Sequence, residues 1–188
     1  MEYAFHVFNK LSADGIALST DKLLYEKNPC PQGGQTPVVV CVGSDLAIGD
    51  SLGPLVGSML RYKTQGLNLF LYGCLSAPVT AKEVKYLRSF LKETHPKRPV
   101  IAVDAAVGEQ GDIGLIKIND NPLYPGAGAN KKLGCFGDVT VMGIVAEKSL
   151  GNYALLNCTR LNLVYKMAEQ ISDGISAYLW NRETTRQE

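Results

Sequence analysis

The stretch Pro37–Pro54 reads PVVVCVGSDLAIGDSLGP, and it decides the fold. Its first part, Pro37–Gly43, is apolar and rich in β-branched side chains, which is typical of a strand buried on both faces of a parallel sheet. The residues that follow predict a helix over Asp50–Gln65. Pro54 is tolerated there because it falls in the first turn. A buried strand followed directly by a helix is the repeating unit of α/β folds.

Further strands and helices follow the same pattern along the chain. Apolar runs predict buried strands over Leu67–Gly73, Pro99–Asp104 and Val139–Ala146. A helix is predicted from Thr80, where Glu83 completes a capping box, and it places Val84, Leu87, Phe90 and Leu91 on one face. A long helix is predicted over Thr159–Trp180, with a buried stripe of Leu161, Val164, Met167, Ile171, Ile175 and Leu179. The alternation predicts a three-layer α/β/α fold with a mostly parallel sheet.

The other segments are predicted from turn residues and alternation. Gly111–Asn119 alternates in a way that indicates an antiparallel edge strand. Gly and Pro predict loops over Asn28–Pro37 and Asn121–Gly137. Residues 1–36 are the hardest to interpret, although Leu11–Lys27 has the composition of a helix. The length suits one α/β domain over 1–188, with its core in 37–188.

Composition excludes several functional classes. The chain is 46% hydrophobic and 20% charged, which is ordinary for a globular protein. A formal net charge of +1 gives no electrostatic reason to expect nucleic acid or an anionic membrane as a partner. The N-terminal residues lack the pattern of a secretory signal. Five scattered cysteines without C-x-x-C spacing indicate reduced thiols, so we expect a cytoplasmic protein.

Two aspartates are the main candidates for chemistry. In an open parallel sheet, sites lie beyond the carboxyl ends of the strands, because the connecting loops converge there. Asp50 opens the first predicted helix after the Pro37–Gly43 strand, and Asp104 ends the Pro99–Asp104 strand. Two neighbouring carboxylates repel each other, so one keeps its proton near neutral pH and the pair can act as acid and base. We therefore predict Asp50 and Asp104 as catalytic residues.

Alternatives to a catalytic pair remain open at this point. Asp50 stands where an aspartate often caps a helix, and Asp104 could be held by a structural partner. The two carboxylates could also hold a divalent metal, although no cofactor is expected. Lys131 and Lys132 stand on the long Gly/Pro loop, as solvated surface lysines or as groups that hold an acidic substrate. We also predict Ser44, Asp45 and Ser51, which lie beside Asp50, as substrate-binding residues.

Other kinds of site fit the sequence less well. Gly43–Ser51 resembles a phosphate loop, but its glycine spacing is one residue too long, and an aspartate stands in place of the lysine. No G-x-S-x-G elbow is present. Cys74 follows a strand, yet a cysteine nucleophile needs a base. His95 precedes the strand that Asp104 ends, roughly 13 Å away at about 3.3 Å per residue, and His6 lies in the uninterpreted N-terminal segment. A Cys–His pair or a zinc site is therefore disfavoured.

Three motifs together resemble the spore germination protease family. Asp50-Ser51-Leu52-Gly53-Pro54 after a V-V-V-C-V-G strand resembles that family's P-D-A-L-G-P signature. The run from Val100 to Ala105 resembles its V-I-A-I-D-A, and PGAGANKKLG (125–134) resembles its G-x-G-x-x-N-K-R stretch. The resemblance covers roughly residues 37–146 and is strongest to the shorter YyaC-type sporulation proteins. It implies a three-layer fold of the phosphorylase/hydrolase-like kind and an endopeptidase with Asp50 and Asp104 as its acidic pair.

A wider group, the hydrogenase-maturation endopeptidases, shares part of this pattern. Their G-N-x-L-x-x-D-E-G-x-G motif aligns by spacing with Gly43–Gly53, which puts Asp50 where their nickel-binding glutamate stands. Asp104 matches their second acidic ligand. Those enzymes also need a histidine from a later loop, and this sequence has none after His95. We therefore expect proton-transfer chemistry at the aspartate pair in preference to nickel binding.

The resemblances imply a function in sporulating bacteria. The expected substrates are small acid-soluble spore proteins or another protein of the sporulating cell, and the expected compartment is the cytoplasm of that cell or of the forespore. Two other functions stay open: a protease-like protein that binds or regulates without cutting, and a metal-assisted hydrolase. A homo-oligomer is also left open. The first 36 residues have no assigned role.

Overall fold

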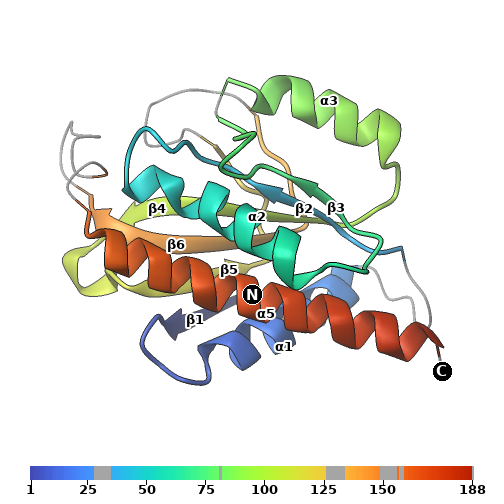
Figure 1. Ribbon diagram of the computed structural model, residues 1–188, viewed down its shortest axis with the longest axis horizontal. Helices are drawn as coiled ribbons and strands as arrows, with labels where there is room; N and C mark the ends of the chain where they lie inside the picture. The colour runs from blue at the N-terminus through green and yellow to red at the C-terminus, as the bar shows by residue number, and fades with distance from the viewer. Residues whose placement is uncertain (28–34, 81, 126–133, 149–155, 157–158, 188) are drawn as a thin grey trace.

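The computed structural model describes residues 1–27, 35–80, 82–125, 134–148, 156 and 159–187. Its centre is a six-stranded sheet with the strand order β1-β5-β6-β4-β2-β3 (Figure 1). Four strands are parallel: β2 (Val38–Cys41), β3 (Phe70–Tyr72), β4 (Val100–Gly108) and β6 (Val139–Glu147). The sheet is therefore mixed but mostly parallel, as the sequence predicts.

Helices cover both faces of this sheet, so the predicted three-layer α/β/α fold is confirmed. One face carries α1 (Ser12–Lys27), α2 (Leu52–Lys63) and α5 (Leu161–Gln187). The other face carries α3 (Val84–Thr94), which stands apart from the other helices in Figure 1. In the described part of the chain, no helix is long and apolar enough to cross a membrane.

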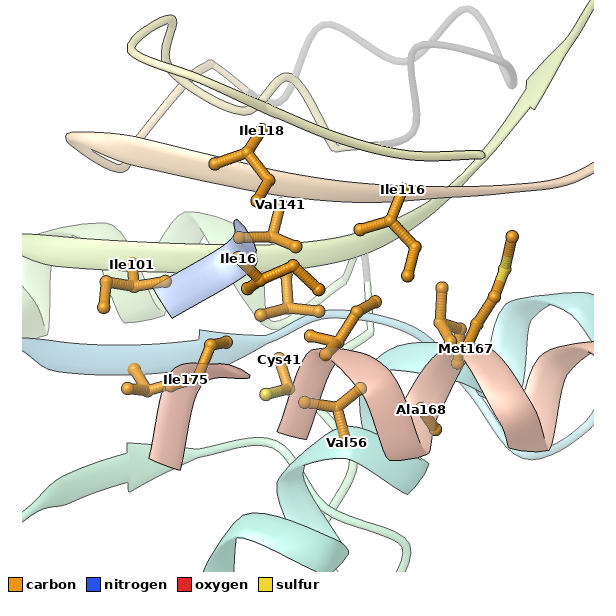
Figure 2. Close-up of a cluster of buried hydrophobic side chains, with 14 of the residues drawn as sticks. Ile16, Cys41, Val56, Ile101, Ile116, Ile118, Val141, Met167, Ala168 and Ile175 are labelled. Atoms are coloured by element: carbon orange, nitrogen blue, oxygen red, sulfur yellow. The ribbon is translucent and has the colours of Figure 1, made fainter. Parts of the chain in front are cut away.

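Two clusters of buried side chains lie on the two faces. The larger cluster joins α1, α2 and α5 to the sheet, and Figure 2 shows its side chains converging from helices and strands, among them Ile16, Val56, Ile101, Val141 and Met167. The smaller cluster joins α3 to the sheet and includes Val38, Val40, Val84, Leu91 and Ala102. Strands β2 and β4 contribute to both clusters, because successive side chains of a strand point to opposite faces. Their continuous apolar sequence follows from this double burial.

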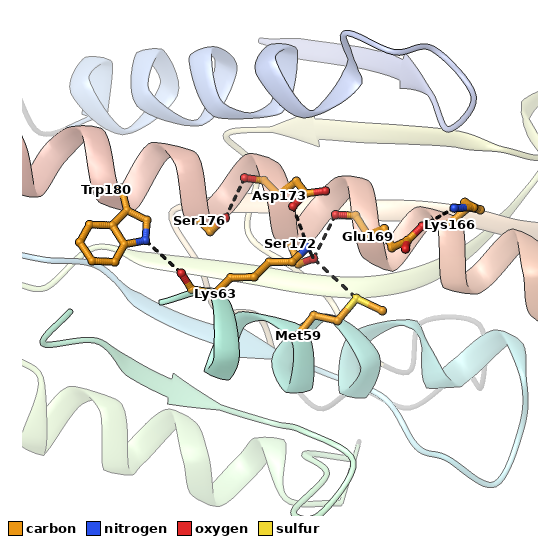
Figure 3. Close-up of polar contacts among 8 residues, drawn as sticks. All are labelled: Met59, Lys63, Lys166, Glu169, Ser172, Asp173, Ser176 and Trp180. Atoms are coloured by element: carbon orange, nitrogen blue, oxygen red, sulfur yellow. Dashed lines mark hydrogen bonds and ion pairs between the residues drawn. The ribbon is translucent and has the colours of Figure 1, made fainter. Parts of the chain in front are cut away.

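The end of the chain is fastened to α2 by polar contacts (Figure 3). Lys63 Nζ donates to Asp173 Oδ1 at 2.7 Å and to Ser172 Oγ at 2.8 Å. Trp180 Nε1 donates to the backbone oxygen of Lys63 at 3.0 Å. Helix α5 thereby supports α2, whose N-terminal end follows the loop after β2 and so fixes where that loop lies.

The antiparallel strand is not at the sheet edge, which corrects the prediction for Gly111–Asn119. Strand β5 (Leu115–Asn119) is antiparallel to β6 but lies between β6 and β1 (Glu2–His6), which is the true edge. The sequence did not indicate β1, because only one side of a short edge strand is covered and its burial alternates. Its partner also lies more than a hundred residues away along the chain.

Other elements differ in extent from the predictions. Thr80 N–H donates to Glu83 Oε2 at 3.0 Å, which is one of the two contacts of the predicted capping box. However, α3 begins at Val84, and its N-cap residue, Glu83, has no side-chain capping hydrogen bond. Leu161 is 58% exposed, so it does not belong to the buried stripe of α5. The predicted loops over Asn28–Pro37 and Asn121–Gly137 fall partly outside the described residues.

Candidate active site

Successive strands are added on one side of β2 and then on the other, so the connections reverse direction between β2 and β4. We call the region at the carboxyl ends of these two strands the opening between β2 and β4. From β2 the chain passes through α2 to β3 on one side, and from β3 through α3 to β4 on the other side of β2. The carboxyl ends of β2 and β4 therefore flank the point at which the direction of the connections reverses, and this is where open α/β sheets hold their ligands. Both predicted aspartates lie at this opening.

Asp50 lies in a tight turn that closes the loop after β2. The backbone oxygen of Asp50 accepts a hydrogen bond from Ser44 N–H at 3.1 Å, and Ser51 N–H donates to Ala47 O at 3.0 Å. Gly43, at φ +142°, packs directly against the Asp50 carbonyl, where any Cβ would clash. Glycine at position 43 is thus required by the shape of this loop.

Asp50 does not cap a helix. It is the middle residue of a short 3₁₀-helix, η1 (Gly49–Ser51), and α2 follows with Ser51 at its N-cap position. Neither N-cap has a side-chain capping bond. The capping interpretation of Asp50 therefore finds no support, and the half-buried carboxyl is left for another use.

Asp104 lies within β4 and not at its end, which corrects the prediction of a strand over Pro99–Asp104. β4 continues to Gly108, paired with β6, and Asp104 stands opposite Met142. The ladder between β2 and β4, however, stops at the pair Cys41 and Val103. Asp104 is thus the first residue past the end of its neighbour, and it still reaches the opening for the reason that the sequence suggested.

The carboxyl of Asp104 points to the α3 side of the sheet. Its neighbour Ala102 belongs to the cluster on that face, whereas Val103 belongs to the cluster on the other. Asp104 Oδ1 accepts a hydrogen bond from Ala105 N–H at 2.8 Å. This hydrogen bond joins adjacent residues and uses only Oδ1, so it does not involve Oδ2.

Both aspartates have raised pKa values. Burial raises the pKa of Asp104 well above its usual range, the negative charge of Asp50 raises it further, and the hydrogen bond from Ala105 offsets only part of this. Burial also raises the pKa of Asp50, against a smaller lowering by a backbone hydrogen bond from Ser44. Because the charge of Asp50 acts on Asp104, the two residues share one electrostatic environment. One carboxyl of the pair is therefore favoured in its protonated form.

The predicted substrate-binding residues are placed differently from one another. Ser44 is half-buried and its Oγ accepts Leu46 N–H at 3.2 Å, while Asp45 is exposed. Ser51 is 7% exposed and its Oγ donates to Ile48 O at 2.6 Å, which gives it a role inside the loop. Lys131 and Lys132 lie outside the described residues.

Neither histidine belongs to the set of contacts around the aspartates. His95 Nε2 lies 2.7 Å from Tyr72 Oη and packs against the ring of Phe70, under α3. His6 is in the edge strand β1, opposite Leu115. Within the described residues, no group of three or more His, Cys, Asp or Glu side chains could hold a metal ion.

A second polar cluster surrounds Cys74, and the sequence indicated only its cysteine. Arg61 Nη2 lies 3.2 Å from Cys74 Sγ, and Ser76 Oγ lies 3.3 Å from the same sulfur. Burial alone would raise the pKa of Cys74, but hydrogen bonds from Ser76 and Ala77 and the positive charge of Arg61 outweigh it, so the pKa is lowered. Arg61 comes from the last turn of α2, a position that its sequence context presents as an ordinary exposed one.

Comparisons with known proteins place these features in a family. The family described as "Protein of unknown function (DUF1256)" matches residues 18–174. "Uncharacterized protein YyaC" of Bacillus subtilis (strain 168) is 43% identical over 155 residues, which are 82% of this chain and 74% of the relative. The resemblance to YyaC-type proteins is thereby confirmed. A crystal structure of the NiFe hydrogenase maturation protease HycI from Thermococcus kodakarensis KOD1 aligns with 21% identity, 79% of this chain, 96% of that chain and a TM-score of 0.49.

Proposed function

We propose, from the premise that the chain belongs to the DUF1256 family, that it is an endopeptidase of sporulating bacteria that hydrolyses spore or sporulation proteins with Asp50 and Asp104. The observation that carries the proposal is the electrostatic pairing of these two aspartates at the opening between β2 and β4. The motif resemblance to the germination protease supplies the reaction class and the substrate class.

The pair would work by transferring protons around an attacking water. Asp104, whose pKa is shifted more by burial and by the neighbouring charge, serves as the acid. Asp50, as a carboxylate, removes a proton from the water while the water oxygen bonds to the peptide carbonyl carbon. The carbon–nitrogen bond of the resulting tetrahedral intermediate then breaks, and Asp104 gives its proton to the leaving nitrogen. Asp50 ends protonated and Asp104 ionised, and proton exchange with solvent restores both.

Cleavage of a purified small acid-soluble spore protein tests this proposal. The variants Asp50→Asn and Asp104→Asn keep the shape of each side chain but cannot exchange protons. Each is expected to lower the cleavage rate by about 10²–10⁴-fold, the usual contribution of a positioned acid or base. Asp21→Asn makes the same chemical change at an exposed position of α1 and is expected to cleave like the unmodified protein.

Other outcomes would select a different function. Cleavage that is unchanged in both variants would sink the aspartate assignment. Tight binding of the spore protein without hydrolysis, retained in both variants, would instead support a binding or regulatory protein. A divalent metal that copurifies with the unmodified protein, and is lost from Asp50→Asn, would support a metal-assisted hydrolase in which the two carboxylates are ligands.

A further inference from the structure

Strand β4 continues past the strand that pairs with it on one side. The β2–β4 ladder ends at Val103, while the β4–β6 ladder continues to Gly108. Beyond this point the chain of β2 turns away, because Val42 bridges to Val79, and Gly43 N–H donates to Val79 O at 2.9 Å. In Figure 1, β4 and β6 run on together past the arrowhead of β2. Residues 105–108 are half-buried.

The direction of the backbone groups along this extension follows from the bonds at its two ends. Val38 and Val42 donate to the oxygens of Pro99 and Val103, so odd-numbered residues of β4 face β2. The oxygens of Val100 and Gly108 accept bonds on the β6 side, so even-numbered residues face β6. The bulge between β4 and β6 inserts its extra residue in β6 and leaves this alternation intact.

It follows that Ala105 and Val107 turn their backbone groups toward the side that β2 has left. Ala105 N–H is used by Asp104 Oδ1. The oxygen of Ala105 and the N–H and oxygen of Val107 face the opening, and no strand among the described residues pairs with them there. We call the segment Ala105–Val107 the β4 edge. Backbone groups in such a row are a template for another extended chain.

We propose that the β4 edge binds the backbone of an extended polypeptide, which adds to the sheet in the position that β2 has vacated. This deepens the proposed function and rests on it for the identity of the polypeptide as substrate. A backbone is the ligand that supplies a donor and an acceptor at every second residue, which is what an open strand edge requires. A chain bound there lies beside Asp104, the residue that directly precedes the edge, so one of its peptide bonds reaches the aspartate pair.

The loop on the far side of the opening carries apolar side chains in water. Leu46 is 92% exposed and Ile48 is 38% exposed, both in the turn that leads to Asp50. Exposed apolar side chains are unfavourably solvated, so a bound chain that covers them gains free energy from the burial of apolar surface. A polypeptide with an apolar side chain next to its scissile bond suits this position, because its backbone pairs with the β4 edge while its side chain covers Leu46 or Ile48.

Amide hydrogen exchange on the full chain tests the pairing directly. The double variant Asp50→Asn/Asp104→Asn is used so that bound chains are not cut, with two probes: 15-residue peptides that tile a small acid-soluble spore protein, and the unfolded protein β-casein. A bound probe is expected to slow exchange of the Val107 amide at least tenfold. The Ala106 amide, which faces β6, is the internal control and should not change. Binding that leaves Val107 exchange unaltered overturns the proposal, as does a failure of both probes to bind.

Two substitutions at one position separate the backbone from the side chain. Val107→Pro removes the N–H donor, whereas Val107→Ala keeps it and shortens the side chain. We expect Val107→Pro to weaken probe binding at least tenfold relative to Val107→Ala, and equal binding by the two would overturn the proposal. If Val107→Pro does not fold, N-methylation of the peptide gives the same test, because only alternate positions should abolish binding.

Failure of this inference is distinguishable from failure of the proposed function. Aspartate-dependent cleavage with an unprotected Val107 amide would retain the endopeptidase and reject the β4 edge. Protection of Val107 without any cleavage by the unmodified protein would retain the edge and reject the endopeptidase.

Discussion

The charge of Asp50 acts on the carboxyl of Asp104, although one residue lies in a turn after β2 and the other within β4. The two residues are far apart along the chain, but β2 and β4 are neighbours in the sheet, so both residues lie at the opening between these strands. We therefore expect the titration of Asp104 to depend on the residue at position 50. In Asp50→Asn the neighbouring charge is gone, so the pKa of Asp104 should fall. A carbon-13 titration of the side-chain carboxyls measures it, and an unchanged Asp104 curve would show that the two do not interact.

The difference in stability between Asp104→Asn and the unmodified protein should depend on pH in a defined direction. The pKa of Asp104 is higher in the folded than in the unfolded chain, so folding favours its protonated form. That contribution is fully present below the unfolded pKa of about 3.9 and is lost as pH rises through the raised folded value. Asparagine cannot ionise, so the variant escapes this loss. From pH 4 to pH 8, the free energy of unfolding of Asp104→Asn should rise relative to the unmodified protein.

Denaturant unfolding at several pH values measures that trend. Asp21→Asn, on the exposed side of α1, is the control and should follow the unmodified protein. A constant difference between Asp104→Asn and the unmodified protein at all pH values would contradict the raised pKa.

The close approach of α2 to the end of β2 should make Gly53 intolerant of any side chain. A Cβ at this position would overlap the backbone oxygen of Val42. We expect Gly53→Ala to lower the free energy of unfolding by about 1–3 kcal/mol, the usual cost of overpacking. Gly111→Ala is the matched control, because a Cβ there meets nothing within 4 Å. Trp180 fluorescence reports the unfolding, as it is the one tryptophan of the chain. Equal stability of the two variants would refute the close packing.

Arg61 should govern the reactivity of Cys74. The guanidinium beside the sulfur lowers the pKa of the thiol. In Arg61→Gln the positive charge is lost, so the midpoint of alkylation against pH should move to higher pH. Mass spectrometry of the iodoacetamide-labelled protein resolves Cys74 from the other four cysteines. Arg98→Gln, at an arginine that packs on Phe70, should leave the midpoint in place. A shift of the same size in both variants would mean that Arg61 has no specific effect.

The central sheet could be predicted from the sequence because a strand that is buried on both faces is apolar at nearly every position. Val38–Cys41 and Val139–Val145 are apolar at nearly every position, and each prediction of a parallel strand there is confirmed. Strand β1 could not be found in this way, because its stability depends on pairing with β5 far along the chain. The extension of β4 past Asp104 was missed for a related reason. Its residues are half-buried and small, and their strand geometry comes from β6.

The candidate site was predicted in its location and only partly in its composition. Asp50 and Asp104 are found at the predicted edge, because the carboxyl ends of parallel strands can be read from the strands themselves. The Ser51 hydroxyl bonds within its own loop, and Arg61 approaches Cys74 from the end of α2. Both contacts depend on how a loop and a helix end are packed. Such contacts carry no periodic signal in the sequence.

The two faces of the sheet carry hydrophobic clusters of unequal size, so the free energy of local unfolding should differ between the two helical layers. Helix α3 buries only Val84 and Leu91 fully, whereas three helices share the larger cluster on the other face. The α3 layer should therefore detach in a sub-global fluctuation of low free energy while the rest of the fold persists. Because Asp104 points to this same layer, such a fluctuation should expose more of its half-buried side chain to solvent. The stability of the smaller cluster should therefore set how often solvent reaches Asp104 from the α3 side.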